Sequence, residues 1–169
     1  YYNAVKKLAT SSTGIDVTGT VNSGNIIITD AGPQIDFIDS DNNPDFRIKN
    51  GNGTLRFTDT TNTADRLSIS GIGDISFYED TGSTAKFFWD ASAESLGIGT
   101  TSPYTLLELS STDPIIRMTD SNGVTDKSIY EIRAIGASGS ESLEFRTVND
   151  ANNSYNKLLV LEHGGNVGI

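Results

Sequence analysis

Apolar residues in this chain occur in short runs that alternate with polar residues, and clusters of Gly, Asn, Asp, Ser and Thr separate the runs. Leu55 and Phe57 alternate with polar residues, and Leu67 and Ile69 repeat the pattern. Alternation with a period of two is typical of a strand that packs on one face and is solvated on the other. The pattern therefore predicts an all-β fold made of short antiparallel strands and hairpins.

The strongest hairpin signal lies at 46–58, where two strand-like runs flank the turn Asn50-Gly51-Asn52-Gly53. An Asn-Gly turn between alternating runs strongly favours a hairpin. Residues 1–13 fit either a helical turn or an extended segment. Further strands are predicted at 15–17, 20–21, 26–29, 35–39, 66–70, 75–78, 86–89 and 96–98.

The second half of the chain repeats the order of the first. PIIRMTDSNG from Pro114 matches PQIDFIDSDN from Pro33, and Leu143-Glu144-Phe145 matches Leu55-Arg56-Phe57. The offset grows along the chain, which places small insertions in loops. Such internal similarity indicates tandem repeats. We expect a segment with short strands at 1–32, a first β repeat with its connector at 33–103, and a second repeat at 104–169 that is truncated at its connector, as in a window from a longer repetitive protein.

The apolar stripe of each repeat is thin, because only 36% of the residues are hydrophobic and each strand offers two or three apolar side chains. A core of that size is marginal for one chain, and several strand edges would stay open. Identical chains that share one interior would solve both problems. The residues predicted to line this shared interior are Leu55, Phe57, Leu67, Ile69, Ile75, Phe77, Phe87, Trp89, Leu143, Phe145, Leu159 and Leu161.

The formal net charge of −10 argues against nucleic acid and anionic membranes as partners, since both require clustered Lys and Arg. Lys6-Lys7 is a pair rather than a patch. No apolar run is long enough to span a bilayer, so no membrane insertion is expected. The chain has no cysteine, which excludes disulfides and thiolate metal sites.

One loop places oxygen-bearing side chains at alternate positions, as a calcium loop does: Asp39, Asp41, Asn43 and Asp45. The calcium pattern requires Gly at the sixth position and an acidic residue at the twelfth, where this chain has Pro44 and Asn50. A solvated Asx-rich turn is the better interpretation, so these residues are weak candidates and no metal or cofactor is predicted.

Catalytic chemistry has little support in the sequence. His163 is the only histidine, which excludes a multi-histidine site within one chain. The motifs Gly71-Ile72-Gly73 and Gly97-Ile98-Gly99 lack the residues that complete a phosphate-binding loop. The acidic residues lie mostly in polar loops, and no pair is marked as a glycosidase pair. We predict no catalytic residue and no enzyme activity. Tyr155, in the loop 152–156, is a weak candidate for receptor binding.

Two phrases, LGIGTTSP at 96–103 and GIDVTGTV at 14–21, resemble recurrent phrases in the shafts of bacteriophage tail fibres and related virion fibres. The resemblance implies a homotrimer whose short strands intertwine or pack about a threefold axis. It also implies a virion location, a structural role in host attachment, and contacts with other virion or tail proteins and with a host surface glycan or protein. A carbohydrate-binding module of a viral fibre or bacterial adhesin is the alternative function, and a polysaccharide-degrading tail spike is the third.

Overall fold

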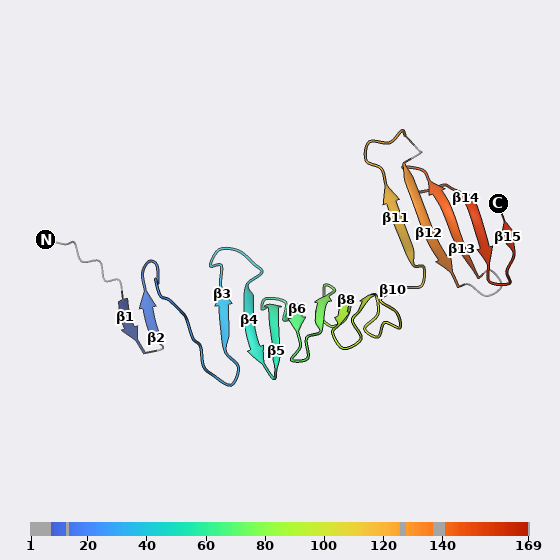
Figure 1. Cartoon of the computed structure of the whole chain (residues 1–169). Helices are drawn as coiled ribbons and strands as arrows, with labels where there is room; N and C mark the ends of the chain where they lie inside the picture. The colour runs from blue at the N-terminus through green and yellow to red at the C-terminus, as the bar shows by residue number, and fades with distance from the viewer. Residues whose placement is uncertain (1–7, 13, 126–127, 137–140, 169) are drawn as a thin grey trace.

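The computed structural model describes residues 8–12, 14–125, 128–136 and 141–168, and these residues form strands, turns and loops without a helix. The predicted all-β fold with short antiparallel strands is confirmed. Three sheets follow one another along an elongated chain, with the two termini at opposite ends (Figure 1). The described residues therefore include no helix long and apolar enough to cross a membrane.

The first sheet is a hairpin of β1 (Leu8–Ser11) and β2 (Gly14–Val17). A long connection leads from it to the next sheet (Figure 1). The strands predicted at 20–21 and 26–29 are wrong, because both segments lie in this connection without regular structure. The sequence Ile26-Ile27-Ile28 has high strand propensity, but no strand of the described chain pairs with it.

The second sheet has eight strands in the order β10-β9-β8-β7-β6-β5-β4-β3. Neighbouring strands are antiparallel, except that β10 runs parallel to β9. The predicted hairpin at 46–58 is present as β4 and β5. The strands are β3 (Gln34–Phe37), β4 (Phe46–Gly51), β5 (Thr54–Asp59), β6 (Ala64–Ile69), β7 (Ile75–Tyr78), β8 (Ala85–Asp90), β9 (Ser95–Ile98) and β10 (Leu107–Leu109).

The phrase LGIGTTSP covers the end of β9 and the start of the connection that returns the chain as β10, parallel to β9. Gly97 and Gly99 are required there because other backbone atoms approach them closely. A Cβ at Gly97 would lie 2.3 Å from the Thr100 carbonyl oxygen, and one at Gly99 would lie 2.0 Å from that of Ser110. Gly99 also has φ +83°, a conformation that other residues rarely adopt. Both glycines therefore have structural roles in the connection.

The third sheet has five strands in the order β11-β12-β13-β14-β15, all antiparallel. Its strands are β11 (Ile115–Thr119), β12 (Ile129–Ile135), β13 (Ser142–Val148), β14 (Tyr155–Glu162) and β15 (Val167–Gly168). The division between the two large sheets comes after β10, whereas the repeat boundary expected from the sequence lies at residue 103. Residues 107–109 thus pair with the eight-stranded sheet.

The segments that match in sequence occupy matching strands in the two large sheets. β3 and β11 are both edge strands, and β5 and β13 carry the related sequences that contain Phe57 and Phe145. The register of β5 against β6 shifts directly after Phe57, and that of β13 against β14 shifts directly after Phe145. The five-stranded sheet therefore repeats the order β3 to β7, including the position of a β-bulge.

The described chain encloses very little apolar volume. Its buried hydrophobic residues are Ala64, Ala85, Ile129 and Val148, whereas the largest fully buried side chains are Asp59, Glu131 and Glu144. Each large sheet is a single layer (Figure 1), and no second layer among the described residues covers it. A conventional core between two layers is missing from the part of the chain that the structure describes.

Candidate functional site

One face of the eight-stranded sheet carries two apolar rows that run across the strands. Residues directly opposite each other in a pleated sheet share a face, so the strand register defines the rows. The first row is Ile35, Ile48, Phe57, Leu67, Phe77, Phe87, Ile98 and Leu109. The second row is Leu55, Ile69, Ile75, Trp89, Leu96 and Leu107.

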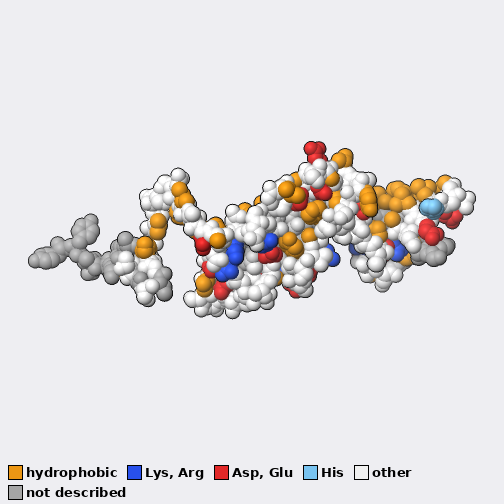
Figure 2. Space-filling model, turned by 90° about the horizontal axis from the view of Figure 1, so that it is seen from below, with side chains coloured by type: hydrophobic (Ala, Val, Ile, Leu, Met, Phe, Trp, Pro, Cys, Tyr) orange, Lys and Arg blue, Asp and Glu red, His pale blue; other side chains and the backbone are white. Residues whose placement is uncertain are grey.

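The five-stranded sheet has two equivalent rows. Ile116, Ile132, Phe145 and Leu159 form one row, and Ala134, Leu143, Leu161 and Val167 form the other. We call the sides that carry these rows the apolar faces, and the opposite sides the polar faces. In the space-filling view, hydrophobic side chains form a band on the surface of the C-terminal part of the chain (Figure 2).

The apolar faces are uncovered in the single chain. Every residue predicted to line a shared interior lies on one of these faces, and none of them is buried. Phe77 is 47% exposed although its ring makes a T-shaped contact with Phe87, with centroids 5.2 Å apart. Contiguous exposed apolar surface of this kind marks an interaction site in soluble proteins.

On the polar face of the five-stranded sheet, Glu131 forms ion pairs with two arginines. Its side chain is 0% exposed and accepts hydrogen bonds from the guanidinium groups of Arg117 at 2.6 Å and Arg146 at 2.7 Å. Burial alone would raise the pKa of Glu131, but the hydrogen bonds from the two arginines outweigh it and lower the pKa. Glu131 therefore stays ionised between its partners.

Glu144 is the second buried carboxylate on this face. It forms an ion pair with Lys157, although neither carboxylate oxygen accepts a hydrogen bond of good geometry. Arg133 lies opposite Glu144 in the register and forms a two-bond ion pair with Asp113, at 2.5 and 2.9 Å. The charged side chains thus neutralise one another across four strands.

Equivalent pairs occupy the polar face of the eight-stranded sheet with their signs reversed. Asp36 and Arg47, joined at 2.5 Å, occupy the positions of Arg117 and Glu131. Arg56 and Asp65, joined at 3.2 Å, occupy the positions of Glu144 and Lys157. The same cross-strand sites therefore hold opposite charges in the two repeats.

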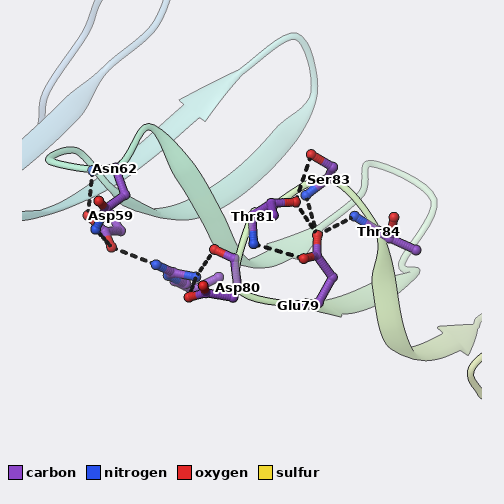
Figure 3. A network of polar contacts seen from close by, with 8 residues as sticks. Asp59, Asn62, Glu79, Asp80, Thr81, Ser83 and Thr84 are labelled. Atoms are coloured by element: carbon purple, nitrogen blue, oxygen red, sulfur yellow. Dashed lines mark hydrogen bonds and ion pairs between the residues drawn. The ribbon is translucent and has the colours of Figure 1, made fainter.

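Two carboxylates bind the loops that follow β5 and β7, two interior strands of the eight-stranded sheet (Figure 3). Glu79 accepts a hydrogen bond from the Thr81 hydroxyl and three from the backbone N–H groups of Thr81, Ser83 and Thr84, which together lower its pKa to about 2. In this way the Glu79 carboxylate binds its own loop.

Asp59 closes the preceding loop in the same manner. It accepts hydrogen bonds from the Asn62 side chain at 2.9 Å, from Arg66 at 2.7 Å and from the Asn62 backbone at 3.0 Å, and these lower its pKa to about 2. Both carboxylates are held in structural contacts, which leaves them unsuited to proton transfer near neutral pH.

The weak calcium candidates lie in one loop, 39–45, where they form hydrogen bonds with one another and with neighbouring residues. The Asp45 carboxylate accepts the backbone N–H of Asp39 at 2.8 Å, and Asn43 accepts the hydroxyl of Thr61 at 3.2 Å. Among the described residues, no group of three or more His, Cys, Asp and Glu side chains is placed to hold a metal ion. The loop has the bonding of an Asx-rich turn.

The other candidate residues, His163 and Tyr155, belong to the five-stranded sheet and the turn that follows β14. His163 is exposed in the turn after β14 and lines a hollow of about 420 Å³ with Glu144 and Lys157. Tyr155 is the first residue of β14 rather than part of a loop, and it is 53% exposed with the Arg146 guanidinium 4.9 Å from its ring centroid. Tyr155 lies on the polar face, whereas His163 also lines a hollow with Leu143 and Leu161 of the apolar face.

Sequence reasoning missed the buried charge network. Glu131, Glu144 and Arg146 occupy alternate strand positions that normally indicate a solvated face. Oppositely charged residues that lie opposite each other on neighbouring strands, such as Glu131 and Arg146, could have indicated this network. Such pairs can be recognised only once the strand register is known. No family model matches the chain, and no curated protein is significantly similar to it.

Proposed function

We propose that this chain is a structural segment of a homotrimeric virion fibre, such as a phage tail fibre, where it forms a β-rich stalk that supports attachment to a host receptor. The observation that carries the proposal is the pair of apolar faces, which the described residues leave uncovered. Copies arranged about a common axis, with these faces inward, would bury both rows of each sheet. The resemblance of LGIGTTSP to fibre phrases supports the choice of a fibre, and with it a virion location.

The direction of the rows supports a stalk. Each row runs across the strands, so an interior built from these rows would run along the sheet, with the strands lying across the fibre axis. Strands are spaced about 4.8 Å apart in this direction, and each spacing is held by a ladder of backbone hydrogen bonds. Such an arrangement resists stretching and bending, as the mechanical role requires.

The polar faces would remain outside and in contact with water. Their carboxylates are paired with arginine or lysine in both sheets, and Asp59 and Glu79 are engaged in loop closure. This arrangement favours a structural role over hydrolysis, and we assign no catalytic residue.

A carbohydrate-binding module is the second candidate function, and Tyr155 is the observation that favours it. Its half-exposed ring lies on the outward polar face, and aromatic faces of this kind stack on sugars. Arg146 holds the ring in place from the same face. In this case the segment would take part in receptor recognition as well as support it.

Replacing Trp89 with Ala tests the structural role. The change removes the largest side chain of the second row, and we expect loss of assembly or of heat resistance, measured by light scattering and thermal unfolding. The control is Tyr155→Ala, which alters the polar face and is expected to leave the assembly intact. If Trp89→Ala leaves a fully heat-resistant assembly and abolishes only host binding, Trp89 belongs to a receptor site and the stalk proposal is wrong.

A further inference from the structure

The connection between β2 and β3 contains an apolar segment that the chain leaves bare. Ile26 and Ile27 are 72% and 83% exposed, and Ile28 is 46% exposed. Residues 18–31 form no hydrogen bond with the rest of the described chain. After this segment, the chain is first bonded to the sheet at Pro33, whose carbonyl oxygen accepts a hydrogen bond from the Asn50 N–H. In an extended chain, Ile26 and Ile28 would point to one side and Ile27 to the other. Apolar residues on both sides are typical of a strand that is covered on both faces.

The edge strand β3 offers unpaired backbone groups close to this segment in sequence. The Asn50 N–H donates a hydrogen bond to the Pro33 carbonyl oxygen. Because hydrogen-bonded pairs alternate in an antiparallel ladder, the backbone N–H and C=O groups of Ile35 and Phe37 point toward β4. The backbone N–H groups of Gln34 and Asp36 therefore point away from the sheet. β3 contains no proline and no bulge, and Asp36 is neutralised by Arg47, so the short length of the strand, four residues, is the remaining protection of this edge.

The segment is uncovered and the outer edge of β3 is unpaired. We therefore propose that residues 25–29 become a β-strand only in the assembly, by adding to the outer edge of β3 of a second copy of this chain. The inference rests on the proposed homo-oligomer and specifies how its copies interlock. The chain would then pass from one copy to its neighbour at the point where the apolar rows begin.

A second copy is the partner that fits the charges. Identical chains of net charge −10 repel one another, so contacts between copies are favoured where charged residues are missing. Residues 18–29 contain no charged residue. The segment also leads directly into β3, whose Ile35 starts the first apolar row. When copies pack their apolar faces together, the segment of one copy therefore comes close to the edge strand β3 of another.

Hydrogen–deuterium exchange of the assembled full chain tests the proposal. We expect the amides of residues 25–29 to exchange about tenfold or more slowly than in an unstructured chain, and to lose this protection when the assembly is diluted into monomers. Gln34→Pro removes an outward N–H of β3 without removing a bond to β4, and should abolish the protection of 25–29. Gln34→Ala keeps the N–H and should preserve it, while β4 to β9 stay protected in both variants.

Three results would overturn the inference while leaving the proposed function intact. Unprotected amides at 25–29 in a homo-oligomer would show that no strand forms. Protection that survives in monomers would show a hairpin within one chain. Protection that survives Gln34→Pro would show that the segment is covered by another surface or another protein. A native mass of a single chain is a different result, which contradicts the proposed function itself.

Discussion

The eight-stranded and five-stranded sheets share an order of strands and a bulge position, yet they carry opposite charges at equivalent sites. Asp36–Arg47 in one sheet corresponds to Arg117–Glu131 in the other. The apolar rows, by contrast, keep their character in both sheets. These cross-strand sites therefore accept complementary charges of either sign, whereas the apolar face keeps apolar residues at nearly all equivalent sites, with Asn50 in the place of Ala134 as an exception.

The equivalent ion pairs of the two sheets differ in how deeply they are buried. Asp36 and Arg47 are each about one-third exposed, while Glu131 and Glu144 are almost fully buried. A buried ion whose partner is removed destabilises a fold strongly, whereas an exposed pair contributes little. The five-stranded sheet should therefore depend on Glu131 and Glu144 more than the eight-stranded sheet depends on Asp36 and Arg47; the buried carboxylate of the eight-stranded sheet is Asp59, which is paired with Arg66.

The largest effect is expected from the apolar face of β8. Phe87 and Phe88 are neighbours that point to opposite faces, so the same substitution can be made on each face. Phe87→Ser should lose about 3 kcal/mol per chain in the assembled state and dissociate the copies, as measured by light scattering. Phe88→Ser should leave the mass of the assembly unchanged. Equal loss of assembly in both variants would contradict the assignment of the faces.

The second-largest effect tests whether the burial of an ion pair decides how much it contributes to stability. Glu131→Gln leaves Arg146 buried beside a neutral group and should cost about 3 kcal/mol, with the five-stranded sheet unfolding first in urea. Asp36→Asn changes the corresponding ion pair of the other sheet and should have little effect. Hydrogen exchange resolved by strand distinguishes the sheets, and similar losses in both would show that burial does not decide the outcome.

A smaller effect tests whether the sign of a pair is interchangeable. Lys157→Asp places a second carboxylate next to Glu144 and should destabilise the five-stranded sheet. Adding Glu144→Arg recreates the arrangement of Arg56 and Asp65, and should recover about 1 kcal/mol of the loss. Urea unfolding of the two variants measures this coupling, and no recovery in the double variant would mean that the sites are not equivalent.

The smallest effect concerns acid. Asp59 and Glu79 have pKa values lowered to about 2 from the ordinary values of 3.8 and 4.5. A lowered folded-state pKa gives stability that is present above the unfolded-state pKa and lost as pH falls through the folded-state value. The melting temperature of the eight-stranded sheet should therefore decline between about pH 4.5 and pH 2.

Glu79→Gln should flatten part of that decline, because glutamine cannot take up the proton. Thermal unfolding at several pH values measures the slope. An unchanged slope in the variant would show that Glu79 does not link the loop to acid stability.

Much of the fold could be predicted from the sequence, because two-residue alternation directly reports which side chains share a face. Alternation alone places Leu55 with Phe57, and Leu143 with Phe145, on a common side, and the strand register confirms both assignments. The Asn-Gly turn likewise fixed the hairpin of β4 and β5. These features are local, so a short window of sequence contains them.

Features that depend on distant partners could not be predicted. Ile26 to Ile28 have strand propensity, but a strand also needs a neighbour, and no strand in the described ranges pairs with them. The parallel pairing of β10 with β9 depends on the close backbone approach at Gly97 and Gly99. The burial of Glu131 depends on Arg117 and Arg146 meeting it from two other strands.

The mass of the native assembly tests the central claim most directly, because the chain leaves both apolar faces uncovered. One chain has a mass of 18.1 kDa, and native mass spectrometry of the intact protein at neutral pH counts the copies. We predict a species of three chains. A single chain that remains folded and unfolds cooperatively at all concentrations would contradict the account.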